Sequence, residues 1–150
     1  MNQPEGAHMA GGTELEPLNV NVRIKISALW TSMLFVFAYV DLFSLYRPDF
    51  RADLKRGEAS GFTINQLYLL GTTVYVVIPS LMVFVALVVR PRVNRIANIA
   101  LGIVYALTII AGAIGEWGYY IFGGAIEIAL LAAVLYYAWT WPKSTLTTCP

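Results

Sequence analysis

Histidine and cysteine are nearly absent from this sequence of 150 residues, with one of each. The single cysteine, Cys149, forms neither an internal disulfide nor a Cys-x-x-Cys redox pair. The single histidine, His8, lies in a polar N-terminal stretch, where we expect it to be solvated rather than to bind a metal. The serine, threonine and tyrosine hydroxyls of the apolar segments therefore have no histidine base. We expect no catalytic residue, no metal site and no cofactor, and a protein that is not an enzyme.

Charge is also scarce. Charged residues make up 13% of the chain, about half the usual share in soluble domains, which is roughly 25%. Ten basic and nine acidic side chains nearly balance, which gives no reason to expect a nucleic-acid partner. Hydrophobic residues make up 58% of the chain, and the mean hydropathy is +0.65. Because the charges are bunched between long apolar runs, the composition excludes a water-soluble globule.

The apolar runs are long enough to cross a bilayer, which takes roughly 20 residues per helix. The sequence predicts a transmembrane domain at 23–142 between a disordered N-terminal tail, 1–22, and a C-terminal tail, 143–150. Short connections make consecutive helices antiparallel, so the predicted fold is an all-α integral membrane four-helix bundle with up-and-down spans. The four predicted spans are about 26–46, 64–89, 95–115 and 119–141.

The orientation follows from the turn between the second and third spans. Three arginines occupy this turn, Arg90, Arg92 and Arg95. With Arg23, Lys25 and Lys143, six basic residues lie on this side of the membrane, against four on the other. Because positive charge favours the cytoplasmic side, we expect both termini in the cytoplasm and a multi-pass protein of the inner (plasma) membrane.

Two features concern helix packing. The small residues Gly102 and Ala106 in the third span, and Gly123 and Gly124 in the fourth, permit close approach of helix backbones. Pro79, near the middle of the second span, cannot donate to the carbonyl of the residue four positions earlier. We expect a kink there.

An ordered set of residues runs through all four spans: Tyr39-x-Asp41-x-Phe43, Pro48, Ile78-Pro79-x-x-Met82, Asn94-Arg95-x-x-Asn98-Ile99, Ile126-Glu127 and Ala138-Trp139-x-Trp141. Through this set, residues 24–141 resemble a bacterial family of small four-span membrane proteins known only as a domain of unknown function. The resemblance implies a four-helix membrane bundle and no particular activity. In size and span number the chain is also similar to DoxX-like proteins, a likeness of fold that says nothing of function.

Polar side chains in the spans gather in the predicted outer half, while the inner half is almost wholly aliphatic. Charges inside a membrane are costly and often functional. We therefore predict a polar pocket that opens outward and binds a ligand or a proton. Its candidate residues are Asp41, Gln66, Thr72, Thr73, Glu116 and Glu127.

Each acidic member also has a structural interpretation. Glu116 lies at a span boundary, where water can solvate it. Asp41 is close enough to the surface to hydrate or to pair with Arg47. Glu127 lies deeper, with Gly123 and Gly124 leaving space beside it, and its structural alternative is a hydrogen bond. The candidate partners are Asn65, Gln66, Tyr75 and a carbonyl loosened by Pro79.

A second group lies at the predicted inner end. Asn94 and Asn98 are one helical turn apart, next to the arginines of the turn. Helix capping with contact to lipid headgroups is one interpretation, and a docking site for a partner is the other. The group comprises Arg90, Arg92, Asn94, Arg95 and Asn98.

Two functions are consistent with these features. The first is a non-enzymatic module that binds a small lipophilic molecule or lipid, or assembles with a membrane-protein partner or a second copy of itself. The second is a small proton-coupled transporter that uses a membrane carboxylate. Small multidrug exporters place their essential glutamate in the first span, whereas here the first span carries Asp41 and the deeper acid is in the fourth.

Overall fold

The computed structural model describes residues 20–141, and they form four long helices. The helices are α1 (Val22–Ser44), α3 (Gln66–Val88), α4 (Pro91–Gly112) and α5 (Gly118–Trp139). Each is long and apolar enough to cross a membrane. The prediction of an all-α four-helix bundle is confirmed, and the protein is a multi-pass membrane protein. The predicted disordered tails lie outside the described residues, except for residues 20–22, the last of which begins α1.

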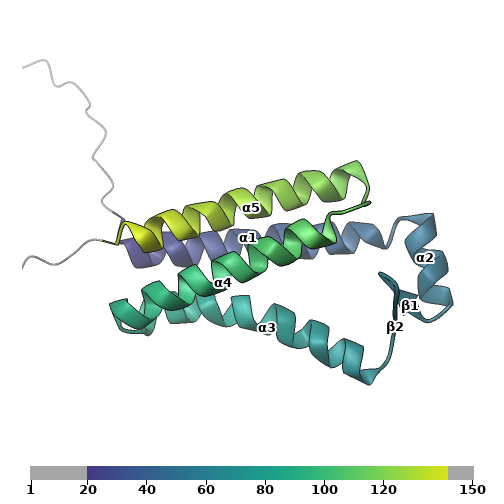
Figure 1. Cartoon of the computed structure of the whole chain (residues 1–150), viewed down its shortest axis with the longest axis horizontal. Coiled ribbons are helices and arrows are strands. Elements are labelled where there is room, and N and C mark those ends of the chain that lie inside the picture. The colour runs from purple at the N-terminus through teal and green to yellow at the C-terminus, as the bar shows by residue number, and fades with distance from the viewer. Residues whose placement is uncertain (1–19, 142–150) are drawn as a thin grey trace, which may run out of the picture.

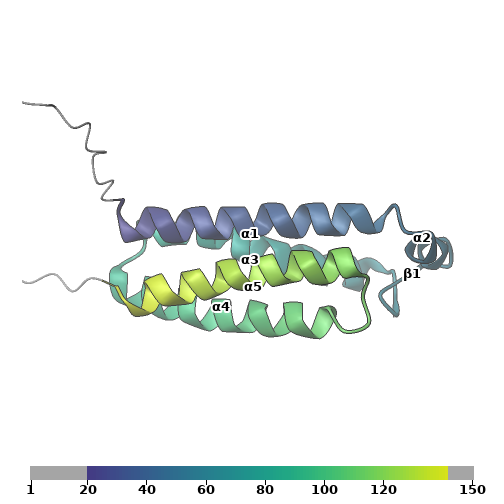
Figure 2. The same cartoon turned by 90° about the horizontal axis from the view of Figure 1, so that it is seen from above.

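The helices run up and down, so that the two ends of the bundle differ (Figures 1 and 2). The α3–α4 turn and both ends of the described chain lie at one end, here called the terminal end. The opposite end, here called the α2 end, carries α2 (Pro48–Lys55) and a small hairpin. Helix α1 packs against α3 and α5, and α4 packs against α5. Helices α3 and α4 have few contacts, and they diverge toward the α2 end (Figure 1).

Two helix starts differ from the predicted spans for reasons of local chemistry. Helix α1 begins at Val22, where the Asn21 side chain caps it by accepting from the Arg23 backbone N–H at 3.0 Å. Helix α4 begins at Pro91 rather than near residue 95, because proline suits the first position of a helix. Arg92 and Arg95 therefore belong to the first turns of α4, not to a loop.

The connection between α1 and α3 contains structure that the sequence analysis did not predict. Strands β1 (Glu58–Ala59) and β2 (Phe62–Thr63) pair antiparallel. Ser60 and Gly61 join them with φ angles of 50° and 80°. Positive φ at both central residues is typical of the tight hairpin turns that match strand twist. The hairpin and α2 lie side by side at the α2 end of the bundle (Figure 1).

Small residues allow α5 to approach its neighbours closely. A Cβ atom at Gly123 would clash with the Val40 side chain of α1, and one at Gly102 of α4 would lie 3.1 Å from the Leu135 side chain of α5. The predicted close approach of helix backbones at these glycines is confirmed. Gly123 therefore leaves no free space, because Val40 fills it.

Pro79 lies inside α3, which runs unbroken from Gln66 to Val88. The missing proline N–H frees the backbone carbonyl of Tyr75. The Tyr105 hydroxyl of α4 donates to this carbonyl at 2.5 Å. The expected kink stays a prediction, but a neighbouring helix satisfies the freed carbonyl, as unpaired backbone groups in a bilayer require.

Candidate functional site

A cavity of about 1120 Å³ lies at the α2 end, between α3 and the other long helices. Residues from all four long helices, α2 and the hairpin line it. Its walls are mainly apolar and aromatic, and include Phe37, Val40, Leu69 and Ile109. Its polar and charged lining side chains are Asp41, Ser44, Arg47, Ser60, Tyr68, Thr72, Tyr75, Thr108, Glu116, Tyr120 and Glu127.

Glu127 of α5 is the most enclosed charged residue of this lining. Its residue is only 3% exposed, and it has no hydrogen-bond or ion-pair partner within residues 20–141. In that part of the chain, every fully enclosed polar side-chain atom does have a partner. The Glu127 carboxylate oxygens therefore reach the open space of the cavity. The proposed hydrogen bonds to Asn65, Gln66 and Tyr75 are absent from the described residues.

Asp41 reaches the same cavity from α1. It is exposed and, within the described chain, has no ion-pair partner. Of its two predicted environments, the pairing with Arg47 is wrong, because Arg47 binds other carboxylates, and exposure to water remains. Asp41 and Glu127 line the same cavity from two different helices, α1 and α5. The fold thus brings two acidic residues that are 86 positions apart into the lining of one cavity. Within residues 20–141, neither of them forms an ion pair with a basic residue.

An ionic network holds the mouth of the cavity. The Arg47 guanidinium pairs with Asp49 at 2.7 Å and with Glu116, and lies 4.9 Å from the Trp117 ring centroid. The hydrogen bond from Arg47 lowers the pKa of Asp49 to about 2, and the same bond raises the pKa of Arg47. Glu116 is therefore an ion-pair partner as well as a boundary residue. The network joins the α1–α2 connection to the α4–α5 turn.

Hydroxyl groups form a second network on the cavity wall, between α3 and α4. The Tyr75 hydroxyl is hydrogen-bonded to the Thr108 hydroxyl at 2.7 Å, and Thr108 donates to the Tyr105 carbonyl at 2.9 Å. From the sequence, Tyr75 was expected only as a candidate partner of Glu127, and Thr108 was not expected at the site. The spacing of Tyr75, four positions before Pro79, was a further signal, because its carbonyl needs a donor from elsewhere.

The remaining predicted pocket residues separate into two groups. Thr72 lines the cavity, and its hydroxyl donates to carbonyls one turn earlier in α3. Thr73 and Gln66 are exposed and do not belong to the lining. Thr73 also donates within its own helix, to the Leu69 carbonyl at 2.7 Å. The structure therefore brings four of the six predicted residues together: Asp41, Thr72, Glu116 and Glu127.

At the terminal end, Asn94 and Asn98 are 0% exposed, so their predicted contact with headgroups or a partner is wrong. Asn98 accepts from the Trp30 indole N–H at 2.7 Å and donates to the Asn94 side-chain oxygen at 2.5 Å. Asn94 donates to the Ala86 carbonyl at 2.6 Å. The reason is the rotation of α4 about its axis, which points both amides inward, where their hydrogen bonds link α1, α3 and α4.

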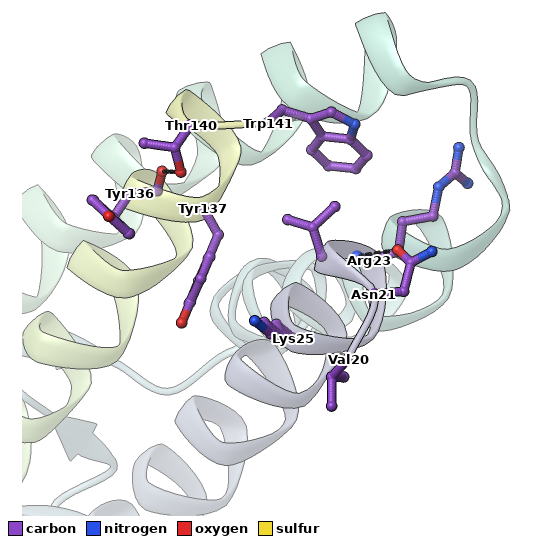
Figure 3. Close-up of a pocket in the computed structure, with 9 residues that line it drawn as sticks. Val20, Asn21, Arg23, Lys25, Tyr136, Tyr137, Thr140 and Trp141 are labelled. Atoms are coloured by element: carbon purple, nitrogen blue, oxygen red, sulfur yellow. Dashed lines mark hydrogen bonds between the residues drawn. The ribbon is translucent and has the colours of Figure 1, made fainter. Parts of the chain in front are cut away.

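The arginines at that end stay at the surface. Arg90 and Arg92 are exposed, and Arg95 lies 5.7 Å from the Trp139 ring centroid. A second cavity, of about 490 Å³, lies nearby between the start of α1 and the end of α5 (Figure 3). Lys25 lies 5.3 Å from the Tyr137 ring centroid in its lining. Such basic and aromatic pairs are typical of membrane–water interfaces.

A comparison with known families decides the relationship of this chain. Residues 18–148 match a family of unknown function, DUF6326. The chain belongs to DUF6326. The predicted resemblance to a four-span family of unknown function is thereby confirmed, and the family match extends beyond both ends of the transmembrane domain. Comparisons with curated proteins and with solved structures returned no match.

Proposed function

We propose that this DUF6326 protein binds a small lipophilic molecule in the cavity at the α2 end, without converting it chemically. The observation that carries the proposal is Glu127, which is 3% exposed, faces the cavity and has no partner within the described residues. A buried ionisable group without a partner is costly and marks a functional site in a membrane protein. The apolar and aromatic walls suit the hydrocarbon part of a ligand.

The chemistry of the lining supports binding rather than catalysis. Residues 20–141 contain no histidine and no cysteine, since the single copies of both lie at positions 8 and 149. The hydroxyl groups of the lining belong to serine, threonine and tyrosine. The Tyr75 and Thr108 hydroxyls are bonded to each other rather than to a base. This pairing supports the proposal of binding without conversion, because a hydroxyl activated for acyl or phosphoryl transfer is bonded to a base.

Native mass spectrometry of the protein, extracted gently from its own membrane, tests the proposal. We expect the wild-type protein to carry a bound small molecule. Ala111 lines the cavity, so an Ala111→Trp substitution fills space and should displace that molecule. Ala100 lies on the same helix outside the lining, so Ala100→Trp serves as the matched control and should retain it.

Loss of the bound molecule in both variants, or in neither, would contradict binding in this cavity. The other form of this proposal is an assembly role, in which the protein binds a membrane-protein partner or a second copy of itself. Native mass spectrometry would then detect a complex of higher mass and no bound small molecule.

A small proton-coupled transporter is the alternative function. The divergence of α3 from α4 toward the α2 end favours it, because a movement of α3 there would then have to break mainly the hydrogen bonds of Tyr75 with Thr108 and Tyr105. A transporter requires alternating access and a carboxylate that exchanges a proton for substrate. Charge movement or proton release in liposomes on addition of substrate would support this function over simple binding.

We further propose that the protein resides in the inner membrane with both termini in the cytoplasm. In this arrangement Arg90, Arg92 and Arg95 contact the headgroups of the cytoplasmic leaflet. A reporter fused after Lys143 should then give a cytoplasmic signal, and one inserted within residues 49–61 an external signal. Changing the three arginines to glutamine leaves three basic residues against four, so the orientation should become mixed. The reverse pattern in the wild-type protein would place the cavity on the cytoplasmic side.

A further inference from the structure

We propose that the ligand of the α2-end cavity is an organic cation, with Asp41 and Glu127 as its counter-charges. This inference rests on the proposed binding function and adds the chemical class of the ligand. Three observations support it: the carboxylates in the lining, the ion pairs that already neutralise Arg47, and the aromatic rings of the cavity wall.

The cavity lining contains three carboxylates and one guanidinium. The guanidinium of Arg47 is already bound by Glu116 and by Asp49, at the mouth. Asp41 and Glu127 therefore face the cavity without a cation from the described part of the protein. An anionic ligand would meet two like charges in a medium of low dielectric constant, and a neutral ligand would leave them unpaired. A cation satisfies both.

The lining favours an organic cation over a metal ion. Within residues 20–141, no three His, Cys, Asp or Glu side chains are grouped so that they could hold a metal ion. The rings of Phe37, Tyr75 and Tyr120 line the same cavity as the two acids. Aromatic faces attract quaternary and protonated amines through cation–π interactions. The apolar walls and the volume of about 1120 Å³ leave room for a ligand with hydrocarbon groups.

Tetraphenylphosphonium is a suitable probe, because tetraphenylborate has nearly the same shape and the opposite charge. The full chain is placed in nanodiscs of phosphatidylcholine, and binding is measured by equilibrium dialysis against empty nanodiscs. We expect saturable binding of tetraphenylphosphonium at one site and no saturable binding of tetraphenylborate. Glu127→Gln and Asp41→Asn should each lower the affinity for tetraphenylphosphonium about thirtyfold, since each removes one partner of a charge pair.

Glu58→Gln is the matched control, because Glu58 is an exposed carboxylate at the same end of the molecule and does not line the cavity. It should leave binding unchanged. A thermal melt of each variant identifies any loss of folding. If Glu127→Gln fails to fold, Asp41→Asn decides the matter, because Asp41 is exposed and makes no ion pair within the described residues.

Three results would overturn the inference: no saturable binding of the cation to the wild-type protein, equal binding of the two probes, or unchanged binding by both acid variants. Displacement of the probe by Mg²⁺ in the wild-type protein, but not in Glu127→Gln, would reassign the site to a metal and overturn it as well. The failure of the proposed function is separate. If Ala111→Trp displaces a neutral or anionic native molecule, the cavity still binds a ligand and only the cationic class is wrong.

Discussion

Replacing Asn98 with leucine is expected to destabilise the bundle by about 2–4 kcal/mol, because it leaves two buried polar groups without partners, at roughly 1–2 kcal/mol each. The Trp30 indole N–H loses its acceptor, and the Asn94 side-chain oxygen loses its donor. Asn98 is 0% exposed, so water cannot replace it. Leucine has the same number and branching of side-chain heavy atoms and leaves no void, so the loss reports on hydrogen bonds rather than on a cavity.

Reversible unfolding in mixed micelles of mild detergent and dodecyl sulfate measures this free energy. Gln66→Leu is the control, because Gln66 is an exposed amide on α3, and its removal should change stability by less than about 0.5 kcal/mol. Combining Asn98→Leu with Trp30→Phe removes the orphaned indole N–H, so the double variant should lose less than the sum of the two single losses. An Asn98→Leu variant as stable as the wild-type protein would show that the buried amides contribute nothing.

The number and direction of the helices could be predicted because the bilayer dictates them. A hydrocarbon core of fixed thickness requires apolar runs of about 20 residues, and four such runs with short connections leave one simple topology. Helix starts were less predictable. Pro91 opens α4 because its ring favours the first helical position, whereas hydropathy alone delays the start to the first apolar residue.

The position of each polar residue along the membrane normal was predicted better than the partners that its side chain contacts. Asn94 and Asn98 stand next to arginines in sequence, which suggested contact with headgroups. Their true environment depends on the rotation of α4 about its axis, which is set by the partners on α1 and α3. The period of a helix shows which residues share a face, but not what that face meets.

For the candidate site, the gathering of four residues follows from depth: Asp41, Thr72 and Glu127 lie in the halves of their helices nearer the α2 end, and Glu116 lies in the α4–α5 turn at that end. Depth says nothing of pairing. Arg47 is six residues from Asp41 but binds Glu116, which is 69 positions away, because the α4–α5 turn lies beside the α1–α2 connection. The hairpin formed by β1 and β2 also escaped prediction, since its strands contain only two residues each.

The proposed function depends on a cavity that reaches into the bundle from the α2 end and that water can enter. Thr108 of α4 lines the cavity, whereas its neighbour Leu107 lies at nearly the same depth, is 61% exposed and does not belong to the lining. A thiol reacts as its thiolate, which forms in water and not in hydrocarbon. A cysteine that faces the cavity should therefore react with a charged reagent, and one that faces lipid should not.

The most direct measurement compares Thr108→Cys with Leu107→Cys in a Cys149→Ser background, in proteoliposomes treated with a cationic methanethiosulfonate reagent. Thermal melts of both variants confirm that they fold. We expect position 108 to be modified about tenfold faster or more than position 107, and the addition of Ala111→Trp to slow position 108 alone. Equal rates at positions 107 and 108, with no effect of Ala111→Trp, would contradict a water-accessible cavity at the α2 end.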